Sequence, residues 1–311
     1  MNRICGGQGR RGVRILMRRA IAFAALSSTL SPGMAAHGAD QFALSAEGAL
    51  PAASALTDRS DFILTGYAGQ GGVMRGTVPQ GTTHLSLNGM EIPFAPDGAF
   101  LIAFDRDAGM EAKLKAELAD GRVIERRLPV APGDWRLQHV NADFRAGVPD
   151  EEFVRRRAVE LERIAAARAV HAVSDGWKQD FRWPLAGRIS GVFGSQRIYR
   201  GKPGSFHGGV DVVARTGTPF VAPADGVVVL AADQPFTLEG YLLILDHGMG
   251  LNSAFLHCSS LSVKEGDKVR QGQVIGTVGA SGRATGPHLH WGMKWNAARI
   301  DPARILAPMA R

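Results

Sequence analysis

Cysteine is nearly absent from this chain of 311 residues, which contains only Cys5 and Cys258. Cys5 lies in an N-terminal stretch that we expect to be removed, so the remaining chain can form no internal disulfide. Cys258 directly follows a histidine, but neighbours along a β-strand point to opposite faces of the sheet. We therefore expect a buried structural cysteine and not a nucleophile. The roughly 270 residues after that stretch suffice for two domains that fold by core packing alone.

Long hydrophobic runs are also lacking near the N-terminus. The run from Ala20 to Leu30 covers about 11 residues, and a helix of that length cannot cross a bilayer core about 30 Å thick. Six arginines and no acidic residue precede the run, and a stretch rich in small residues, 33–39, follows it. This order is typical of a secretory signal peptide and predicts an exported protein without a transmembrane anchor. We predict the signal at 1–39 and leave open whether translation starts at Met1 or Met17.

Outside that signal the chain lacks an excess of charge of one sign. Lysine and arginine total 36 and aspartate and glutamate total 29, a net charge of +7 at pH 7. Without the six arginines of residues 1–39 the totals are 30 and 29, which leaves a net charge of +1. The basic balance of the whole chain is therefore no evidence for nucleic-acid binding, and we expect no nucleic acid among the partners.

Short alternating runs of apolar and polar residues follow an alanine- and serine-rich segment, 40–60, that we expect to be flexible. Within 61–135 these runs are separated by Asn88-Gly89, Asp97-Gly98 and Asp120-Gly121, and such dipeptides are strong hairpin signals. About seven short strands at this spacing predict a small β-sandwich, for which an immunoglobulin-like arrangement is one candidate. The region has no catalytic constellation.

A helix is predicted from Pro149 to Ala172, inside a linker at 136–180. Acidic residues at 150–152 suit the dipole of its first turn. Its predicted apolar positions are Phe153, Val154, Val159, Leu161 and Ile164. We expect the arginines at 155–157 to form a solvated face, with a partner site as the alternative. The helix should connect the two domains and pack on one of them.

The residues with chemical potential are concentrated between Phe206 and Trp291. Five side chains there can bind a borderline metal or move a proton near neutral pH: His207, Asp211, His257, His288 and His290. His288 and His290 are two residues apart, so a strand would place both imidazoles on one face, with Cα atoms about 6.6 Å apart.

His207 and Asp211 are four residues apart, and an extended chain would separate them by about 13 Å. Two ligand atoms of one zinc ion lie no more than about 4.4 Å apart. The segment should therefore fold back, which Gly208 and Gly209 permit through their wider range of backbone angles. Each histidine alone is more often structural. An HxxxD, a third histidine and an HxH within about 85 residues together favour a zinc hydrolase site.

A series of glycine-punctuated motifs runs almost without a gap from Trp183 to Leu306. The motifs are FG at 193–194, HGGVD at 207–211, GTPFVAPADGVV at 217–228, LDHGMGL at 245–251, the histidine of FLHC at 255–258, GDKVRQGQVIGTVG at 266–279 and SGRATGPHLHW at 281–291. Together they resemble the catalytic domain of the M23 zinc metallopeptidases, the lysostaphin and LytM type, which cut peptide bonds in peptidoglycan. The resemblance implies a mainly β chain with a LytM-type antiparallel β catalytic domain, which we place at 181–311.

By this resemblance His207, Asp211 and His290 hold the zinc, and His257 and His288 flank the metal-bound water. Three protein ligands leave a tetrahedral zinc with one open position, as in catalytic sites. Either His257 or His288 can then accept a proton and help to stabilise the oxyanion, and the spacing does not say which.

Two neighbouring positions are also matched to the family. His247 corresponds to a position at a turn beside the site, and we expect it to be structural and not a ligand. Phe255 stands where tyrosine is frequent in the family, so we expect one hydroxyl fewer near the site and an altered rate or substrate fit.

The sequence therefore predicts an exported, monomeric zinc metalloendopeptidase of the periplasm or cell envelope that hydrolyses peptide cross-links of peptidoglycan. The alternative is a non-catalytic LytM-type protein that binds the wall or activates another wall hydrolase. Such relatives typically lack one or more metal ligands, whereas this chain fills all three positions. The N-terminal β region remains open as a spacer, a wall-binding module or a cover for the active site.

Overall fold

The computed structural model describes residues 60–143 and 150–306. The predicted signal peptide, and all but residue 60 of the predicted flexible segment, lie outside the described residues. All described residues belong to one compact unit of the chain. Within the described ranges no helix has the length and apolar character needed to cross a membrane.

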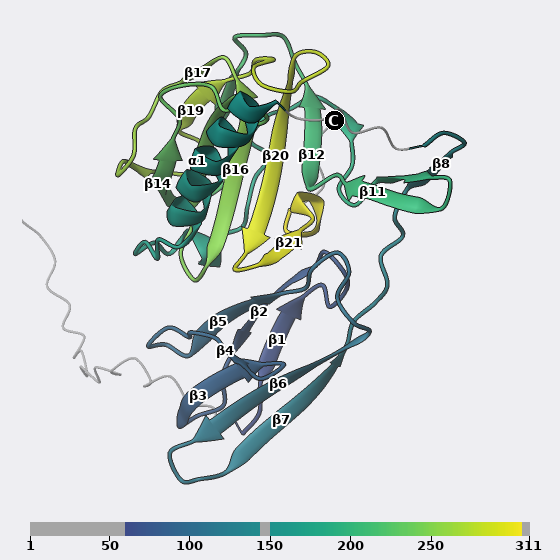
Figure 1. The fold of residues 1–311 in the computed structure, drawn as a ribbon. Helices are drawn as coiled ribbons and strands as arrows, with labels where there is room; N and C mark the ends of the chain where they lie inside the picture. The colour runs from purple at the N-terminus through teal and green to yellow at the C-terminus, as the bar shows by residue number, and fades with distance from the viewer. Residues whose placement is uncertain (1–59, 144–149, 307–311) are drawn as a thin grey trace, which may run out of the picture. The chain divides into compact units, whose positions relative to one another are not determined.

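Seven strands between Ile63 and Pro129 form two antiparallel sheets (Figure 1). Their orders are β1-β2-β5 and β4-β3-β6-β7. The strands are β1 (Ile63–Gly66), β2 (Val73–Thr77), β3 (Thr82–Leu87), β4 (Met90–Glu91), β5 (Ala99–Ala103), β6 (Glu111–Leu118) and β7 (Val123–Pro129). Asn88 and Gly89 join β3 to β4 with positive φ values of 53° and 81°, as a type I′ hairpin turn requires. The hairpin predicted at this dipeptide is confirmed.

These two sheets share a hydrophobic core. On β6, the buried residues Ala112, Leu114 and Ala116 alternate with residues that are at least partly exposed. Phe100 and Ile102 of β5 are fully buried. Two small sheets around one core agree with the predicted β-sandwich, and the immunoglobulin-like arrangement stays a prediction.

The C-terminal part contains a larger antiparallel sheet of eight strands, called here the main sheet. Its order is β18-β14-β15-β16-β20-β12-β9, with β21 paired to β20. The strands are β9 (Arg188–Gly191), β12 (Gly209–Val213), β14 (Gly226–Ala231), β15 (Tyr241–Asp246), β16 (Leu251–Cys258), β18 (Lys268–Val269), β20 (His288–Trp295) and β21 (Ala298–Ile300). The antiparallel β fold predicted for this part of the chain is confirmed.

Smaller elements complete the C-terminal part. One sheet, β13-β19-β17, contains β13 (Pro219–Val221), β17 (Ser260–Leu261) and β19 (Val274–Thr277). Another contains the hairpin of β10 (Gln196–Tyr199) and β11 (Lys202–Phe206), with β8 (Leu137–Val140) parallel to β10. Near the start and the end of the C-terminal part lie two 3-10 helices, η1 (Gly176–Lys178) and η2 (Pro302–Arg304). Because β8 lies at 137–140, the predicted linker also contributes a strand.

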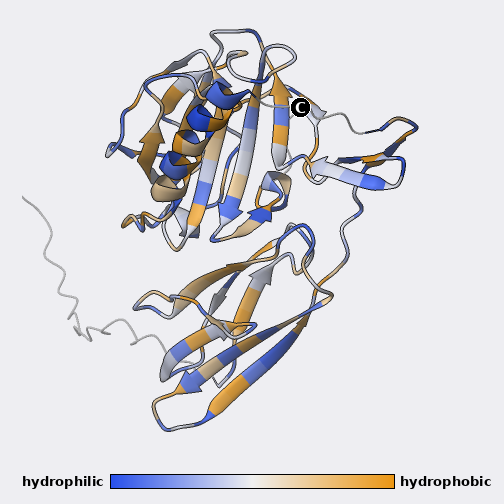
Figure 2. Cartoon of the chain, in the orientation of Figure 1, coloured by the Kyte–Doolittle hydropathy of each residue, from blue (hydrophilic) through white to orange (hydrophobic). Residues whose placement is uncertain are grey.

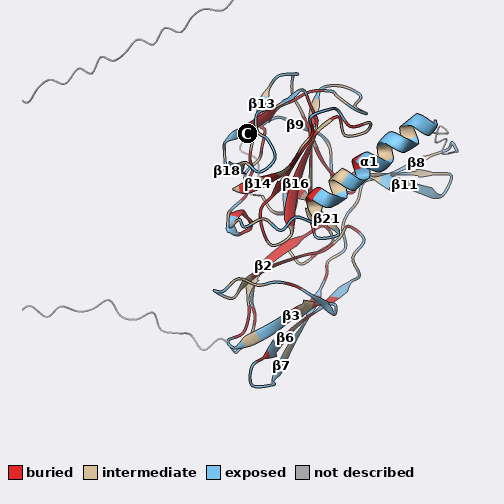
Figure 3. Cartoon of the chain, turned by 60° about the vertical axis from the view of Figure 1, so that its left-hand side comes forward, coloured by how far each residue is buried: buried red, intermediate tan, exposed pale blue. Residues whose placement is uncertain are grey.

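The two faces of the main sheet are covered differently. On one face Phe255 of β16 and Trp291 of β20 are fully buried in the core. On the other face Ile244 and Ala254 are buried in a cluster with Ala167 of the single α-helix in the described residues, α1 (Glu151–Arg168). Figure 3 shows the buried strands in red beside the largely exposed helix, and Figure 2 shows hydrophilic residues over most of that helix.

Helix α1 begins at Glu151, two residues after the predicted start at Pro149. The Asp150 carboxylate accepts a hydrogen bond of 2.7 Å from the Phe153 N–H, and Glu151 and Glu152 occupy the first turn. The helix ends at Arg168, four residues before the predicted end at Ala172.

The buried face of α1 differs from the predicted one. Three of the predicted apolar positions are about half exposed: Val154 at 55%, Val159 at 58% and Leu161 at 50%. Glu160 is buried instead, because its carboxylate accepts hydrogen bonds from Arg157 and from the N–H and hydroxyl of Thr237. Arg157 also bonds Glu239, so the arginine run at 155–157 is not wholly solvated.

Candidate metal centre

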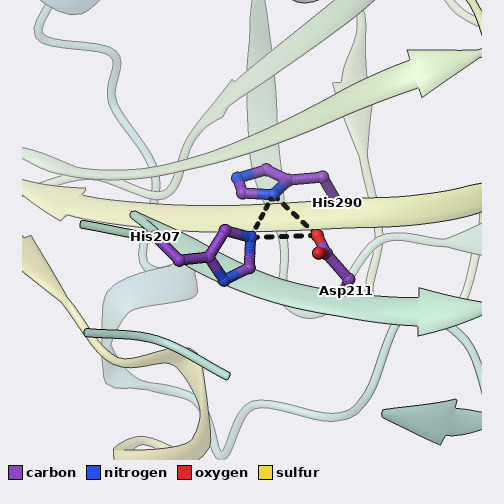
Figure 4. A group of neighbouring side chains, drawn as sticks. All are labelled: His207, Asp211 and His290. Carbon is purple, nitrogen blue, oxygen red and sulfur yellow. Dashed lines mark hydrogen bonds and ion pairs between the residues drawn. The ribbon is translucent and has the colours of Figure 1, made fainter. Parts of the chain in front are cut away.

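Two adjacent strands bring a histidine and an aspartate together (Figure 4). Asp211 of β12 and His290 of β20 are cross-strand partners, so their side chains lie on the same face, the one that α1 covers in part. His207 lies in the two-residue break between β11 and β12. The backbone has no turn or bend at 207–208, so the predicted local fold-back is not seen. The two side chains meet all the same, and His207 Nε2 lies 3.1 Å from Asp211 Oδ1.

The three side chains present their ligand atoms at a spacing that one cation can bridge. His290 Nδ1 lies 2.9 Å from Asp211 Oδ1 and 3.0 Å from His207 Nε2. In a tetrahedral site with bonds of about 2.1 Å, ligand atoms lie about 3.4 Å apart. Among the described residues, these three form the one group of His, Cys, Asp or Glu side chains close enough to hold a metal ion.

The donor set also fits a borderline divalent metal. His207 Nδ1 lies 3.1 Å from the Val192 carbonyl oxygen, and because a carbonyl only accepts, Nδ1 carries the proton. The Nε2 atom of the neutral ring then directs a lone pair to the point that the Asp211 oxygen and His290 Nδ1 also face. Two imidazole nitrogens and one carboxylate oxygen are a set that zinc accepts.

Burial and charge oppose each other in this group. Burial disfavours a charged His207, but the hydrogen bond and charge of Asp211 outweigh it, and the pKa of His207 is raised. Burial also disfavours the Asp211 carboxylate, yet its hydrogen bonds to His207 and His290 hold its pKa far below the usual range. At His290 burial dominates and lowers the pKa. Near neutral pH, Asp211 is therefore an anion and His290 a neutral ring, the protonation states that metal ligands require.

Two further imidazoles border the group. His288 Nε2 lies 3.7 Å from Asp211 Oδ1, and the ring centres of His257 and His288 are 4.9 Å apart. Nδ1 of His288 donates to the Gly286 carbonyl at 2.8 Å, and Nδ1 of His257 donates to the Ser281 carbonyl at 2.9 Å. Each ring therefore keeps its lone pair on Nε2. Burial lowers the pKa of His257, so this ring stays neutral at pH values where an exposed histidine is already protonated.

The backbone at His257 adopts a conformation that is uncommon for a residue with a side chain. Its φ is 64°, in the left-handed region, and its N–H donates to the Glu239 carbonyl at 2.8 Å. The pairing of β16 with β15 is irregular at this point, between Tyr241 and Leu243. Strict alternation along β16 would turn His257 away from the site. The irregularity instead places its ring centre 6.2 Å from that of His290.

Two glycines are needed for space around the site. A Cβ atom at Gly191 would lie 2.3 Å from Asp211 Oδ2, and one at Gly209 would lie 2.4 Å from the Trp291 carbonyl oxygen. Neither Gly208 nor Gly209 has a positive φ. Gly209 therefore serves the close pairing of β12 with β20, and neither glycine uses left-handed backbone.

Two residues near the site in sequence belong to the core. Cys258 is fully buried, and burial raises the pKa of its thiol to about 12, so the predicted structural cysteine is confirmed. Phe255 is fully buried as well, with its ring centre 5.2 Å from Phe220 and 6.5 Å from Trp291. The expectation that residue 255 acts at the site is wrong, because its side chain points to the opposite face of the sheet.

His247 is structural, as predicted. It is fully buried, its Nδ1 donates to the Asp225 carbonyl at 2.7 Å, and its Nε2 accepts from the Ser253 hydroxyl at 2.8 Å. The indole N–H of Trp291 in turn donates to the Ser253 oxygen at 3.1 Å. Each polar atom in this buried chain has a partner, and burial lowers the pKa of His247 to about 4.

Several residues that shape the site have no signal in the sequence. Val192, Ser281 and Gly286 orient imidazoles through backbone carbonyl groups, which every residue type possesses. Arg168 and Lys294 line a pocket that also contains His290, and only the fold brings the end of α1 to this strand.

Comparison with known proteins gives a consistent family assignment. Residues 205–302 match the model of Peptidase family M23. The chain is 35% identical over 152 residues to the cell division protein DipM of Caulobacter vibrioides, a match that covers 47% of this chain and 24% of DipM. It is 36% identical over 132 residues to the peptidoglycan DD-endopeptidase ShyA of Vibrio cholerae, covering 42% of this chain and 29% of ShyA. The chain thus spans about a quarter of the length of these curated relatives.

A solved structure resembles a larger share of the chain. It is a Pseudomonas aeruginosa protein assigned to peptidase M23, with a TM-score of 0.60 and 28% sequence identity. The match covers 78% of this chain and 96% of that one. The antiparallel β fold is therefore of the LytM type, and the match to peptidase family M23 lies at residues 205–302.

Proposed function

We propose that this protein is an exported zinc metalloendopeptidase that hydrolyses peptide cross-links of peptidoglycan. One observation carries the proposal. Three ligand atoms from His207, Asp211 and His290 lie within 3.1 Å of one another, beside two further imidazoles, in a domain of a peptidase family. Relatives named as peptidoglycan endopeptidases support the choice of substrate.

In this proposal the metal is held by His207 through Nε2, Asp211 through Oδ1 and His290 through Nδ1. A bound zinc ion supplies Lewis acidity, which polarises a scissile carbonyl and makes water a better nucleophile at neutral pH. The Val192 carbonyl fixes the His207 ring so that its lone pair points to the metal position.

His257 and His288 move protons in this proposal. Both keep Nδ1 protonated on a backbone carbonyl, so each can accept a proton at Nε2 and later return it to the leaving amine. The lowered pKa of His257 suits a base, and once protonated either ring can donate to a developing oxyanion.

The rival function is a non-catalytic LytM-type protein that binds the wall or activates another hydrolase. Loss of a ligand would favour it, and in this chain all three ligand positions and both neighbouring histidines are present. We therefore favour the enzyme.

Digestion of purified sacculi by the mature protein, with mass analysis of released muropeptides, tests the proposal. His290→Ala should lose bound zinc and all cleavage, because it removes a ligand. His288→Ala should keep zinc and lose most turnover, by about a hundredfold or more. His84→Ala, an exposed histidine on β3, is the matched control and should cleave at the parental rate. Parental cleavage by both site variants would refute the assignment.

We further propose that the protein acts in the periplasm or cell envelope as a monomer. The predicted signal at 1–39 and the substrate both support an extracytoplasmic location. N-terminal sequencing of the exported protein tests the cleavage, and light scattering of the purified protein tests the monomer.

A further inference from the structure

A pocket of about 190 Å³ adjoins the candidate metal centre. His290 and Gly208 line it, so it borders the site described above. Three basic residues line it as well: Arg168, Lys294 and Arg299. We call this the basic pocket.

Three elements bring these basic residues together. Arg168 is the last residue of α1, Lys294 lies in β20 and Arg299 lies in β21. Lys294 follows His290 by four residues on the same strand, so both side chains lie on one face. Arg299 is the cross-strand partner of Lys294, and like charges placed directly opposite each other are destabilising. The fold therefore holds positive charges together against their mutual repulsion.

The pocket lining contains one carboxylate, that of Glu239, against these three cations. Nη1 of Arg168 is buried and has no hydrogen-bond partner. Within the described ranges, neither Arg168 nor Lys294 has an ion pair or a side-chain hydrogen bond. Glu239 also lines the pocket, but Arg157 already binds both of its oxygens at 2.6 and 2.8 Å.

The pKa values agree with cations that lack a counter-ion. Burial and the charge of Arg299 lower the pKa of Arg168 to about 10. Burial and the charges of Arg168 and Arg299 also lower the pKa of Lys294. Asp105, which accepts the backbone N–H of Arg299 at 2.8 Å, opposes this shift without cancelling it. An anion in the pocket would relieve both the repulsion and the unmet hydrogen bond.

The remaining lining indicates which kind of anion fits. It is apolar and consists of Ile164, Leu242, Ile244, Ala254 and Leu256, besides Met293. A small inorganic anion gains nothing from such a surface. A carboxylate on an aliphatic stem buries its methylene groups there, while its oxygens meet the guanidinium and ammonium groups.

We propose that the basic pocket binds a carboxylate of the substrate peptide and so selects peptides that carry one close to the scissile bond. The inference rests on the proposed function, because a peptide bound at the metal centre is what brings the carboxylate to the pocket. A C-terminal carboxylate and one on an aliphatic side chain have the same chemistry, and the experiment separates them.

The test measures binding of a soluble peptidoglycan stem peptide to the full mature protein. The His288→Ala background slows cleavage, and mass analysis of the peptide after each equilibrium titration in the presence of zinc establishes that it is uncleaved. The peptide is prepared with all carboxylates free, with the C-terminal carboxylate amidated, and with the side-chain carboxylate amidated. We expect one amidation to weaken binding by about tenfold or more, as for a lost charge-assisted hydrogen bond, and that form identifies the bound group.

Two pocket variants are then compared with a control in the same background. Lys294→Gln and Arg299→Gln should each weaken binding of the free-carboxylate peptide by about tenfold. Neither variant should change the affinity for the amidated peptide that already binds weakly. Lys268→Gln, exposed on β18 at the far edge of the main sheet, should change neither. Arg168→Gln is a further variant, and circular dichroism and thermal unfolding establish that it is folded before its binding is compared.

Equal weakening of all three peptide forms in the pocket variants, or no weakening, would overturn the inference. Failure of the wild-type protein to digest sacculi would instead overturn the proposed function, while the difference between peptide forms could still be measured. The two failures are therefore distinguishable.

Discussion

Single residues of the site are held mainly by backbone carbonyl groups. Nδ1 of three histidines donates to a carbonyl: His207 to Val192, His257 to Ser281, and His288 to Gly286. All three rings are therefore in the same tautomer, with Nε2 left for the chemistry of the site. His247 uses the same device away from the site, where its Nδ1 donates to Asp225 and its Nε2 accepts from Ser253.

His247 should make the folded state sensitive to acid. Its folded-state pKa of about 4 lies below the ordinary 6.5, so the unfolded chain takes up a proton first as the pH falls. The free energy of unfolding should therefore decrease from about pH 6.5 down to about pH 4, by about 3 kcal/mol from this group.

Urea denaturation at a series of pH values measures this contribution. His247→Gln should be less stable at pH 7 and lose less stability between pH 6.5 and 4 than the parental protein. His84→Gln, at an exposed position, is the control and should follow the parental curve. If the free energy of unfolding of His247→Gln falls as steeply with pH as that of the parental protein, the prediction is contradicted.

At the scale of elements, α1 is attached to the main sheet by a polar network as well as by apolar contact. Glu160 bonds Arg157 and Thr237, and Arg157 bonds Glu239. Glu239 in turn accepts the His257 N–H through its carbonyl. The network that attaches α1 therefore reaches the segment around Glu239. This segment holds the backbone of His257 and forms one side of the basic pocket.

Glu160→Ala should lower the free energy of unfolding by about 2 kcal/mol, because it leaves the partly buried Thr237 N–H and hydroxyl without their partner. Glu162→Ala, exposed on the same helix, is the matched control and should change stability by less than about 0.5 kcal/mol. Thermal and urea unfolding measure both. Equal stability of the two variants would show that the network does not anchor α1.

At the scale of the whole molecule, metal binding and folding should be coupled. The candidate ligands come from two strands of the main sheet and the break before β12, so the site exists only in the folded chain. A ligand that binds only the folded state stabilises it in proportion to the logarithm of its concentration over Kd.

Removal of zinc with a chelator should therefore lower the Tm. At a zinc concentration about a thousand times Kd, the stabilisation lost is about 4 kcal/mol. Differential scanning calorimetry with and without added zinc, together with metal analysis, measures it. His290→Ala is the control, and its Tm should not depend on zinc. If zinc raises the Tm of both proteins equally, the metal does not bind at this site.

Local features of the chain could be predicted because they depend on neighbours in sequence. The Asn88-Gly89 turn and the shared face of His288 and His290 follow from turn geometry and the two-residue period of a strand. The types and spacing of the five candidate site residues also indicated metal chemistry. The resemblance to a family narrowed the ligands to three, which spacing alone did not.

Only the tertiary structure decided the features that depend on contact between segments far apart in sequence. His207 meets His290 across 83 residues because β12 and β20 pair side by side. Apolar periodicity predicted packing for Val154, Val159 and Leu161, which are about half exposed. Glu160 is buried because it bonds Thr237 of a turn that is distant in sequence. The basic pocket likewise exists only where the end of α1 meets β20 and β21. The physical reason is common to all three: a sequence determines which groups are available, whereas packing determines which of them share a low-dielectric site.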